Sequence, residues 1–280
     1  MINFSLNYFI GSLLTAITTF ALAVFVFSRD PKSKLYRSFF FYTFSIAAWS
    51  FPFAFMANAP TKQIAIVLGH GFNFGVSFIC VCFMHFVLIL LNVEEKKRQR
   101  IVKPHYIIAL IFTLLIPTKL MVTDVVPKFG LNYFINPGIA YYPYVFWWVG
   151  CIIYGMSRLF IGYRNSTGNR RNQLKYLFFG SFIGYVGGPG NFLLVFDIKY
   201  PFYPFGTYGV PIYAAITAYA ILRYRFLDIK VAVTRAGIFA FVYLFILGIP
   251  FWIGYKYGLW KYSTLAMLFL ASATFISKNL

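Results

Sequence analysis

The chain has 280 residues, of which 60% are hydrophobic and only 11% are charged, whereas roughly 25% of the residues in an average soluble domain are charged. This composition excludes a soluble globular protein, because a chain of 280 residues cannot bury so much apolar surface in a water-soluble core. The formal net charge of +19 argues against nucleic acid as a partner, since the basic residues are spread over separate loops.

Apolar runs long enough to cross a bilayer recur along the whole chain. A helix needs about 20 apolar residues to cross a hydrocarbon core of about 30 Å, and these runs are apolar on all sides, unlike the alternating strands of a membrane barrel. The first run has no Lys or Arg in front of it, so it lacks the charged start of a cleaved signal peptide and we expect it to be retained. Nine transmembrane helices are predicted, at residues 7–27, 38–58, 64–92, 106–122, 141–163, 176–196, 203–222, 236–254 and 262–277.

The predicted fold is all-α, a polytopic transmembrane helix bundle in three parts. Residues 1–222 hold the first seven helices, residues 223–235 form a basic cytoplasmic junction, and residues 236–280 hold two further helices. The long loop at residues 123–142 is apolar and aromatic. We expect it to lie on the bundle instead of forming a soluble binding domain.

The distribution of Lys and Arg predicts how the bundle is oriented. Of the 25 basic residues, 18 lie in loops on one side of the predicted bundle or just after its last helix. Because cytoplasmic loops carry the excess of Lys and Arg, we expect the N-terminus outside and the C-terminus in the cytoplasm, with the basic loops held near anionic lipid headgroups. These residues are Arg29, Lys32, Lys34, Arg37, Lys96, Lys97, Arg98, Arg100, Lys103, Arg164, Arg170, Arg171, Lys175, Arg223, Arg225, Lys230, Arg235 and Lys278.

A few polar or amphipathic side chains fall inside the predicted helices. His70 and Asn73 are three residues apart and so lie on one face of the third helix. Asn191 lies near the outer end of the sixth helix, and Trp147 reaches a similar depth in the fifth. If these helices are neighbours, the four side chains line a ligand cavity in the outer half of the bundle. Interhelical hydrogen bonding also explains such residues, so both interpretations stay open.

The sixth predicted helix contains a strong helix-breaking signal. Three glycines surround a proline at residues 187–190, in the sequence GGPG. Proline removes a backbone donor and glycine has low helix propensity, so this pattern predicts a kink or a locally opened helix. Broken transmembrane helices often border cavities.

The residues that most membrane enzymes and transporters need are missing. All six acidic residues lie in loops or at helix ends, whereas ion-coupled transporters usually bury a carboxylate at mid-membrane. No HExxH, GxSxG or P-loop motif occurs, and the cysteines Cys80, Cys82 and Cys151 form no CxxC pair. We therefore predict no catalytic residue, no cofactor and no metal site.

Two consecutive stretches carry a family resemblance. The first, RRNQLKYLFFGSFIGYVGGPGN, enters the sixth helix and ends in its Gly-rich segment; the second, DIKYPFYPFGTYGVPIYAAITAYAILRYRFLDIKVAVTRAG, runs through the seventh helix into the junction. Together they resemble the N-terminal seven-transmembrane sensor region of bacterial histidine kinases. The resemblance covers roughly residues 7–230.

The resemblance implies a receptor-like input module in the bacterial inner membrane. Such a module responds to a small-molecule, lipid or other external cue and passes a small displacement to a cytoplasmic histidine kinase and its response regulator, usually as a homodimer. Arg223, Arg225, Asp228 and Arg235 would then form a signalling junction on the cytoplasmic side. An ordinary basic loop that fixes the topology explains these residues as well.

The sequence also departs from the family pattern. It has no phosphoacceptor histidine on a soluble helical hairpin and no Asn- and Gly-rich ATP-binding segment, so we predict that this chain is not itself an enzyme. Two other functions remain: a transporter for a small molecule or lipid, and an accessory membrane subunit without a ligand.

Overall fold

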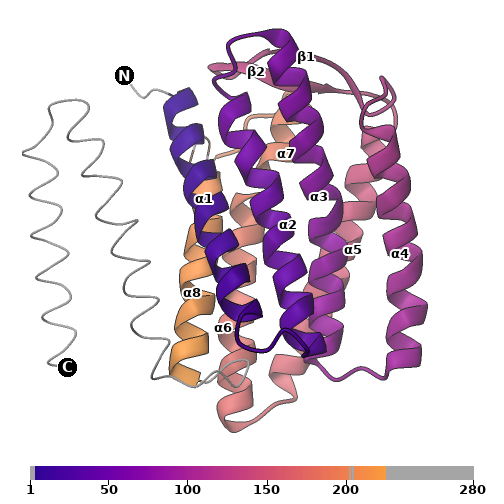
Figure 1. The fold of residues 1–280 in the computed structure, drawn as a ribbon, viewed down its shortest axis with the longest axis vertical. Coiled ribbons are helices and arrows are strands. Elements are labelled where there is room, and N and C mark those ends of the chain that lie inside the picture. The colour runs from indigo at the N-terminus through magenta and orange to yellow at the C-terminus, as the bar shows by residue number, and fades with distance from the viewer. Residues whose placement is uncertain (1–3, 202, 204, 225–280) are drawn as a thin grey trace, which may run out of the picture. The chain divides into compact units, whose positions relative to one another are not determined.

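The computed structural model describes residues 4–201, 203 and 205–224. The chain divides into two compact units, Met1–Leu227 and Asp228–Leu280, so the described residues all belong to the first. The predicted helices at residues 236–254 and 262–277 lie outside the described residues. The helices of the first unit are α1 (Phe4–Phe27), α2 (Lys34–Met56), α3 (Lys62–Leu90), α4 (Glu95–Leu115), α5 (Tyr141–Arg164), α6 (Gly168–Gly187), α7 (Gly190–Val195) and α8 (Gly209–Tyr224), with a short 3-10 turn, η1 (Gly206–Tyr208), before α8 (Figure 1).

The length and hydropathy of these helices fit a membrane protein. Five helical segments are long and apolar enough to cross a membrane: α1, α2, α3, α5 and the segment Gly168–Val195 that combines α6 and α7. α4 begins with the basic sequence EKKRQR, and α8 has only 16 residues. The predicted count of seven plus two transmembrane helices therefore remains a prediction.

The fourth predicted helix is displaced in the structure. It was expected at residues 106–122, but α4 spans Glu95–Leu115. The helix begins earlier because its charged first turns remain helical on the surface, where exposed basic residues have good helix propensity. It ends before Pro117, which disfavours helical geometry in the residue that precedes it.

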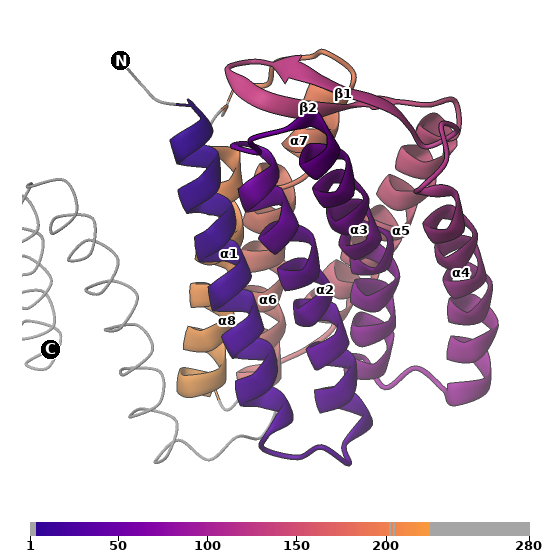
Figure 2. The ribbon, with the colours of Figure 1, turned by 45° about the horizontal axis from the view of Figure 1, so that its top comes forward.

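The all-α prediction missed a β-hairpin. Strands β1 (Val122–Lys128) and β2 (Leu131–Pro137) pair in antiparallel fashion within the predicted outer loop. The two residues between them, Phe129 and Gly130, have φ angles of 52° and 82°, the left-handed geometry that a two-residue hairpin turn requires. The hairpin covers one end of the helices (Figure 2), so the expectation that this loop lies on the bundle is confirmed.

The helices pack as a bundle in which neighbours in sequence are mostly neighbours in space. α2 lies between α1 and α3, α8 packs on α6 and α1, and α4 packs on α3 at the edge (Figures 1 and 2). The α2–α3 contact depends on Gly75, because a Cβ at this position would lie 2.6 Å from the carbonyl carbon of Ala48. Backbones approach this closely only where the side chain is absent.

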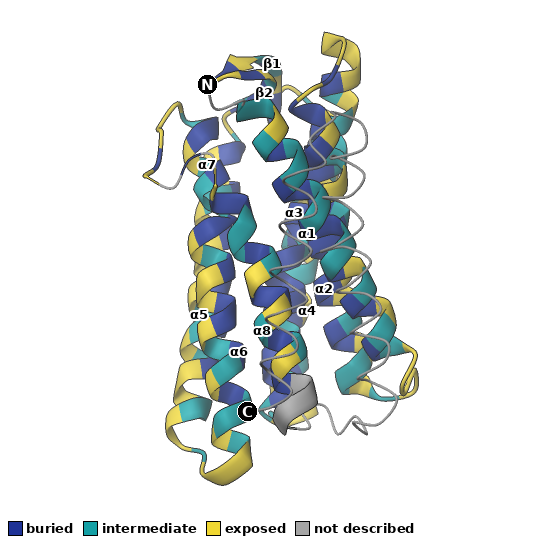
Figure 3. Ribbon diagram, turned by 90° about the vertical axis from the view of Figure 1, so that its left-hand side faces the viewer, coloured by how far each residue is buried: buried dark blue, intermediate teal, exposed yellow. Residues whose placement is uncertain are grey.

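The outer surface of the bundle is apolar, as contact with lipid requires. Burial is concentrated on the inward faces of the helices (Figure 3). Outward-facing residues include Phe146, Val67 and Leu114, which are 84%, 69% and 69% exposed. Extended apolar surface of this kind is rare on soluble monomers and is the normal surface of a helix in hydrocarbon.

The two ends of the bundle differ in charge. The connections α1–α2, α3–α4 and α5–α6 lie together at one end, which we call the basic end, and the hairpin lies at the other, the hairpin end (Figure 1). The basic end carries the Lys and Arg residues of segments 29–37, 96–103 and 164–175. The structure thus brings three of the sequence's basic segments to one end, as a single cytoplasmic face requires.

Candidate functional site

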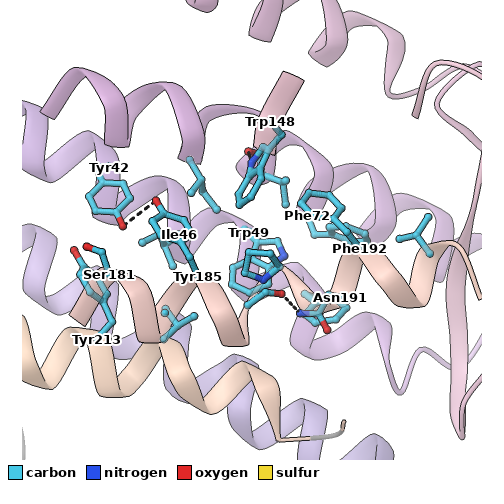
Figure 4. A pocket seen from close by; sticks show the side chains of 18 of the residues that line it. Tyr42, Ile46, Trp49, Phe72, Trp148, Ser181, Tyr185, Asn191, Phe192 and Tyr213 are labelled. Atoms are coloured by element: carbon cyan, nitrogen blue, oxygen red, sulfur yellow. Dashed lines mark hydrogen bonds between the residues drawn. The ribbon is translucent and has the colours of Figure 1, made fainter. Parts of the chain in front are cut away.

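The main candidate site is a narrow cavity of about 60 Å³ inside the helical bundle. Its walls come from α2, α3, α5, α6, α7, α8 and β2, so most elements of the described unit meet there. Asn191 and Phe192 of α7 lie at the end of the cavity nearer the hairpin, and Tyr42, Ser181 and Tyr213 lie at the other end, deeper in the bundle (Figure 4). We call this space the apolar cavity.

Aromatic side chains form most of the cavity wall. Trp148 of α5 meets Phe192 of α7 edge to face, with 5.1 Å between ring centroids, and meets Tyr185 of α6 at 6.0 Å. On α2, Trp49 stacks on Phe53 of the same helix, with 5.9 Å between ring centroids. Such walls present large rigid apolar surfaces, so the cavity suits an apolar occupant.

The few polar groups at the cavity lie mainly at its deeper end. The hydroxyl of Tyr185 donates to the hydroxyl of Tyr42 at 3.2 Å, which links α6 to α2. The indole N–H of Trp148 donates to the carbonyl of Val76 at 3.0 Å. The buried hydroxyl of Ser181 has no hydrogen-bond partner within the described part of the chain. A buried hydroxyl without a partner is energetically costly, so this group is available to a ligand or water in the cavity.

The predicted interruption of the sixth helix is confirmed and borders the apolar cavity. α6 ends at Gly187 and α7 begins at Gly190. Gly187 permits the close approach of η1, because a Cβ there would overlap the carbonyl oxygen of Gly206. Asn191 stabilises the break: its side-chain N–H donates to the carbonyl of Gly188 at 2.8 Å, and its side-chain oxygen accepts from Tyr8 of α1 at 3.0 Å.

The structure separates the four predicted pocket residues. Asn191 lines the apolar cavity, whereas Asn73 lies one layer behind its wall. Asn73 donates to the carbonyl of Gly69 at 2.8 Å and accepts a 3.3 Å hydrogen bond from Tyr141, which is itself a wall residue. His70 is half-buried on α3 and does not line the cavity.

The tryptophan at the cavity is Trp148, not its neighbour Trp147. Successive residues of a helix point about 100° apart, so only one of the two faces the interior. Trp148 is 4% exposed and lines the cavity. Trp147 packs against Phe112 of α4, with 5.6 Å between ring centroids. The sequence alone does not fix this rotation of α5.

The residues that sequence analysis missed are mainly Tyr42, Ser181, Tyr185 and Tyr213. Tyrosine is frequent along the whole chain, so the three tyrosines carried no distinguishing signal. Small residues at positions 180, 181, 184, 187 and 188 do mark one face of the sixth helix. This face packs against α8, and its spacing was the available clue that Ser181 points inward.

The predicted signalling junction falls almost entirely outside the described residues. Arg223 belongs to the last turn of α8, and Arg225, Asp228 and Arg235 lie outside the described part. Within residues 4–201, 203 and 205–224, no cluster of three or more His, Cys, Asp or Glu side chains is arranged to hold a metal ion.

Comparison with known proteins gives a family match over most of the chain. The family described as the N-terminal 7TM region of histidine kinase matches residues 12–230. This range includes every wall residue of the apolar cavity and the helix break at its border. No curated protein and no solved structure matches the chain. The chain belongs to the family of N-terminal seven-transmembrane regions of histidine kinases.

Proposed function

We propose that the chain is a membrane-embedded sensory input module of histidine-kinase signalling, and that its cue acts in the apolar cavity. Family membership supports the signalling role. The cavity supports the place of action, because six helices and one strand contribute to its walls. An occupant would therefore contact most of the elements that have to move in a transmembrane signal.

The size of the cavity suggests how binding produces a displacement. A volume of about 60 Å³ is smaller than the cavity of about 150 Å³ that holds benzene in another protein. A small apolar molecule or the end of an acyl chain would therefore push the wall helices apart. A ligand shifts a conformational equilibrium by its difference in affinity for the two states, so it would stabilise the expanded arrangement.

α8 is the element through which this displacement would reach the basic end. α6 and α8 are closely packed, since a Cβ at Gly184 would lie 3.2 Å from the Cβ of Tyr213. Expansion of the cavity beside Tyr213 would move α8 against α6. α8 leads into the basic junction at residues 223–235, which we propose transmits the movement to a cytoplasmic histidine kinase and its response regulator, within a homodimer.

Filling the cavity tests this proposal. Val76→Phe on α3 places a larger side chain at a wall residue that is 6% exposed, whereas Val67→Phe on the same helix changes a residue that is 69% exposed. In the native host, Val76→Phe should fix the phosphorylation state of the partner response regulator, and Val67→Phe should leave regulation intact. Equal responses in both variants and the unmodified protein would contradict a role for the cavity.

The orientation is tested by labelling introduced cysteines in intact cells. Lys32→Cys lies at the basic end and Thr123→Cys lies at the hairpin end, and both positions are exposed. The natural cysteines are buried, so they add little background. We expect a membrane-impermeant maleimide to label position 123 and not position 32. Labelling at position 32 would overturn the proposed cytoplasmic location of the basic end.

A transporter of small molecules or lipids is the second candidate, because a broken helix borders the apolar cavity. The two functions differ in what Val76→Phe changes. A transporter should lose uptake of its substrate, whereas an input module should change regulator phosphorylation without a change in uptake.

A further inference from the structure

A second cavity, of about 400 Å³, lies at the basic end between α2, α3 and the first half of α4. It shares no lining residue with the apolar cavity. Its charged side chains come from the basic end, and the hydrogen-bonded pair of His85 and Tyr106 lies deeper in the bundle. We call it the basic-end cavity, and its lining residues are Lys34, Arg37, Ser38, Phe41, Cys82, His85, Ile89, Glu95, Arg98, Gln99 and Tyr106.

The basic-end cavity carries an excess of positive charge. Lys34 and Arg37 come from the first turn of α2, and Arg98 comes from the first turn of α4. The one acid that lines it, Glu95, accepts a 2.9 Å hydrogen bond from Lys34 and lies 3.7 Å from Arg98. Lys34 holds the pKa of Glu95 below its ordinary value, so this carboxylate stays ionised. Three cations facing one carboxylate leave the site complementary to an anion.

Arg98 has unused capacity to bind an anion. The residue is only 7% exposed, and its Nη1 group donates to the carbonyl of Val93 at 3.1 Å. Its buried Nε–H group has no hydrogen-bond partner among the residues that the structure describes. An unsatisfied buried donor is unfavourable. A phosphate oxygen would satisfy it, because guanidinium groups bind phosphate through two parallel N–H donors.

The surroundings of the cavity match an amphiphile more closely than a free anion. Phe41 of α2 lines the cavity and is 55% exposed. Farther toward the hairpin end, Ile107 and Leu110 of α4 are 60% and 53% exposed. At 1.5 Å per residue, Ile107 lies roughly 13 Å along α4 from Arg98. If a lipid headgroup bound at Arg98, its acyl chain would therefore lie against this exposed apolar surface.

We propose that the basic-end cavity binds the headgroup of an anionic glycerophospholipid. The phosphate lies against Arg98, Lys34 and Arg37, and an acyl chain runs along the apolar outer faces of α2 and α4. General attraction of basic loops to anionic membranes does not explain a buried arginine with an open donor beside a cavity. The lipid would connect α4 to α2 in addition to the exposed Lys34–Glu95 ion pair, whose side chains are each 59% exposed.

The test is native mass spectrometry of the detergent-solubilised full chain, titrated separately with phosphatidylglycerol and phosphatidylcholine. We expect one phosphatidylglycerol to be retained more tightly than phosphatidylcholine. Arg98→Gln should weaken this affinity by about tenfold or more, since it removes a charge-assisted hydrogen bond. Arg100→Gln is the matched control, because Arg100 is exposed on the same helix and does not line the cavity.

Two further variants keep the test decisive if Arg98→Gln does not fold. Lys34→Gln should weaken phosphatidylglycerol binding, and Glu95→Gln should strengthen it, because it removes the one carboxylate of the cavity. Equal losses in Arg98→Gln and Arg100→Gln would show diffuse charge attraction only and overturn the site. Competition by inorganic phosphate as effective as that by lipid would also overturn it, since the site would then recognise a soluble anion.

Discussion

The ammonium of Lys128, at the end of β1, lies 2.9 Å from a carboxylate oxygen of Asp197, just beyond the end of α7. The same ammonium donates a 3.0 Å hydrogen bond to the carbonyl of Val195, a wall residue of the apolar cavity. The Lys128 side chain is only 5% exposed. The hairpin is thus attached to the short helix that follows the break, and this attachment adjoins the proposed site of the cue.

Replacing this lysine should loosen the hairpin. Lys128→Met keeps most of the apolar stem but removes the ammonium, and a hydrogen bond to a charged group contributes about 1.5–3 kcal/mol. We expect faster backbone hydrogen exchange across residues 122–137, measured by mass spectrometry. Lys62→Met is the control, because the Lys62–Asp124 pair is exposed and an exposed ion pair stabilises less than a buried hydrogen bond to a charged group. Similar exchange in the two variants would show that Lys128 has no special role.

The exposed pair at Asp124 should make the hairpin sensitive to acid. Lys62 donates a 2.7 Å hydrogen bond to Asp124, and this contact, with the backbone N–H of Val125, lowers the pKa of Asp124. A lowered pKa in the folded state stabilises the protein above the ordinary Asp pKa of about 3.9, and this contribution is lost as the pH falls through the folded value.

Pepsin cleavage below pH 4 measures this effect. The hairpin of the unmodified protein should become easier to cleave as Asp124 is protonated. Asp124→Asn should be cleaved at a rate that no longer depends on this titration. A pH dependence that persists in Asp124→Asn would assign the effect to another group.

The close contact between α2 and α3 should not tolerate a side chain at Gly75. An added Cβ would collide with the backbone at Ala48 and Trp49, so Gly75→Ala should separate the helices beside the apolar cavity and destabilise the fold by about 1–3 kcal/mol. Gly150→Ala on α5 is the matched control, since a Cβ there meets no atom within 4 Å. It should be neutral or stabilising by up to about 1 kcal/mol. Thermal unfolding of both proteins in detergent gives the comparison.

The hydroxyl pair of Tyr42 and Tyr185 should show energetic coupling. Tyr42→Phe or Tyr185→Phe removes one partner of the 3.2 Å hydrogen bond between α2 and α6, and each should lower the free energy of unfolding by about 1 kcal/mol. The double variant leaves no orphaned hydroxyl at this contact. It should therefore lose less than the sum of the single variants, which a double-mutant cycle measures. Strict additivity would mean that the hydrogen bond adds no stability.

Asn191 and His70 should respond differently to replacement by alanine. Asn191→Ala removes the groups that bond Gly188 and Tyr8, so it should destabilise the helix break by about 1–3 kcal/mol and change signalling. His70 is half-buried and does not line the cavity, so His70→Ala should leave both properties nearly unchanged. Unfolding midpoints and regulator phosphorylation provide the two measurements. Loss of signalling in a stable His70→Ala protein would extend the functional site to the outer part of α3.

The helix break could be predicted from local sequence, whereas the set of residues that line the cavity could be predicted only in part. The break at residues 187–190 was predictable, because the effect of proline and glycine on a helix depends on the chain within one turn. Asn191 was placed in a cavity from its depth near the outer end of the sixth helix, and it does line the apolar cavity. Asn73 and His70 share a face of α3, yet neither lines the cavity, because contact with a cavity depends on how neighbouring helices pack.

The hairpin was missed for a related reason. Its strands lie in a segment of apolar and aromatic residues, and a short apolar run does not by itself distinguish a strand from a buried helix or loop. The positive φ angles at Phe129 and Gly130 create the turn, but only Gly130 carries a sequence signal for it. The strands are further held by burial of Phe134 and Lys128 against the bundle, which is a tertiary effect.

The sequence by itself determined that this protein is a membrane helix bundle and that it resembles a histidine-kinase sensor region, and it predicted that the basic segments share one side. Hydropathy, charge and family motifs depend only on the order of residues along the chain, so predictions from them need no knowledge of tertiary contacts. Only the tertiary structure decided that Trp148 and not Trp147 faces the apolar cavity and that Lys128 attaches the hairpin to α7. Both depend on helix rotation and on contacts between residues far apart in the chain, which packing fixes and local sequence does not.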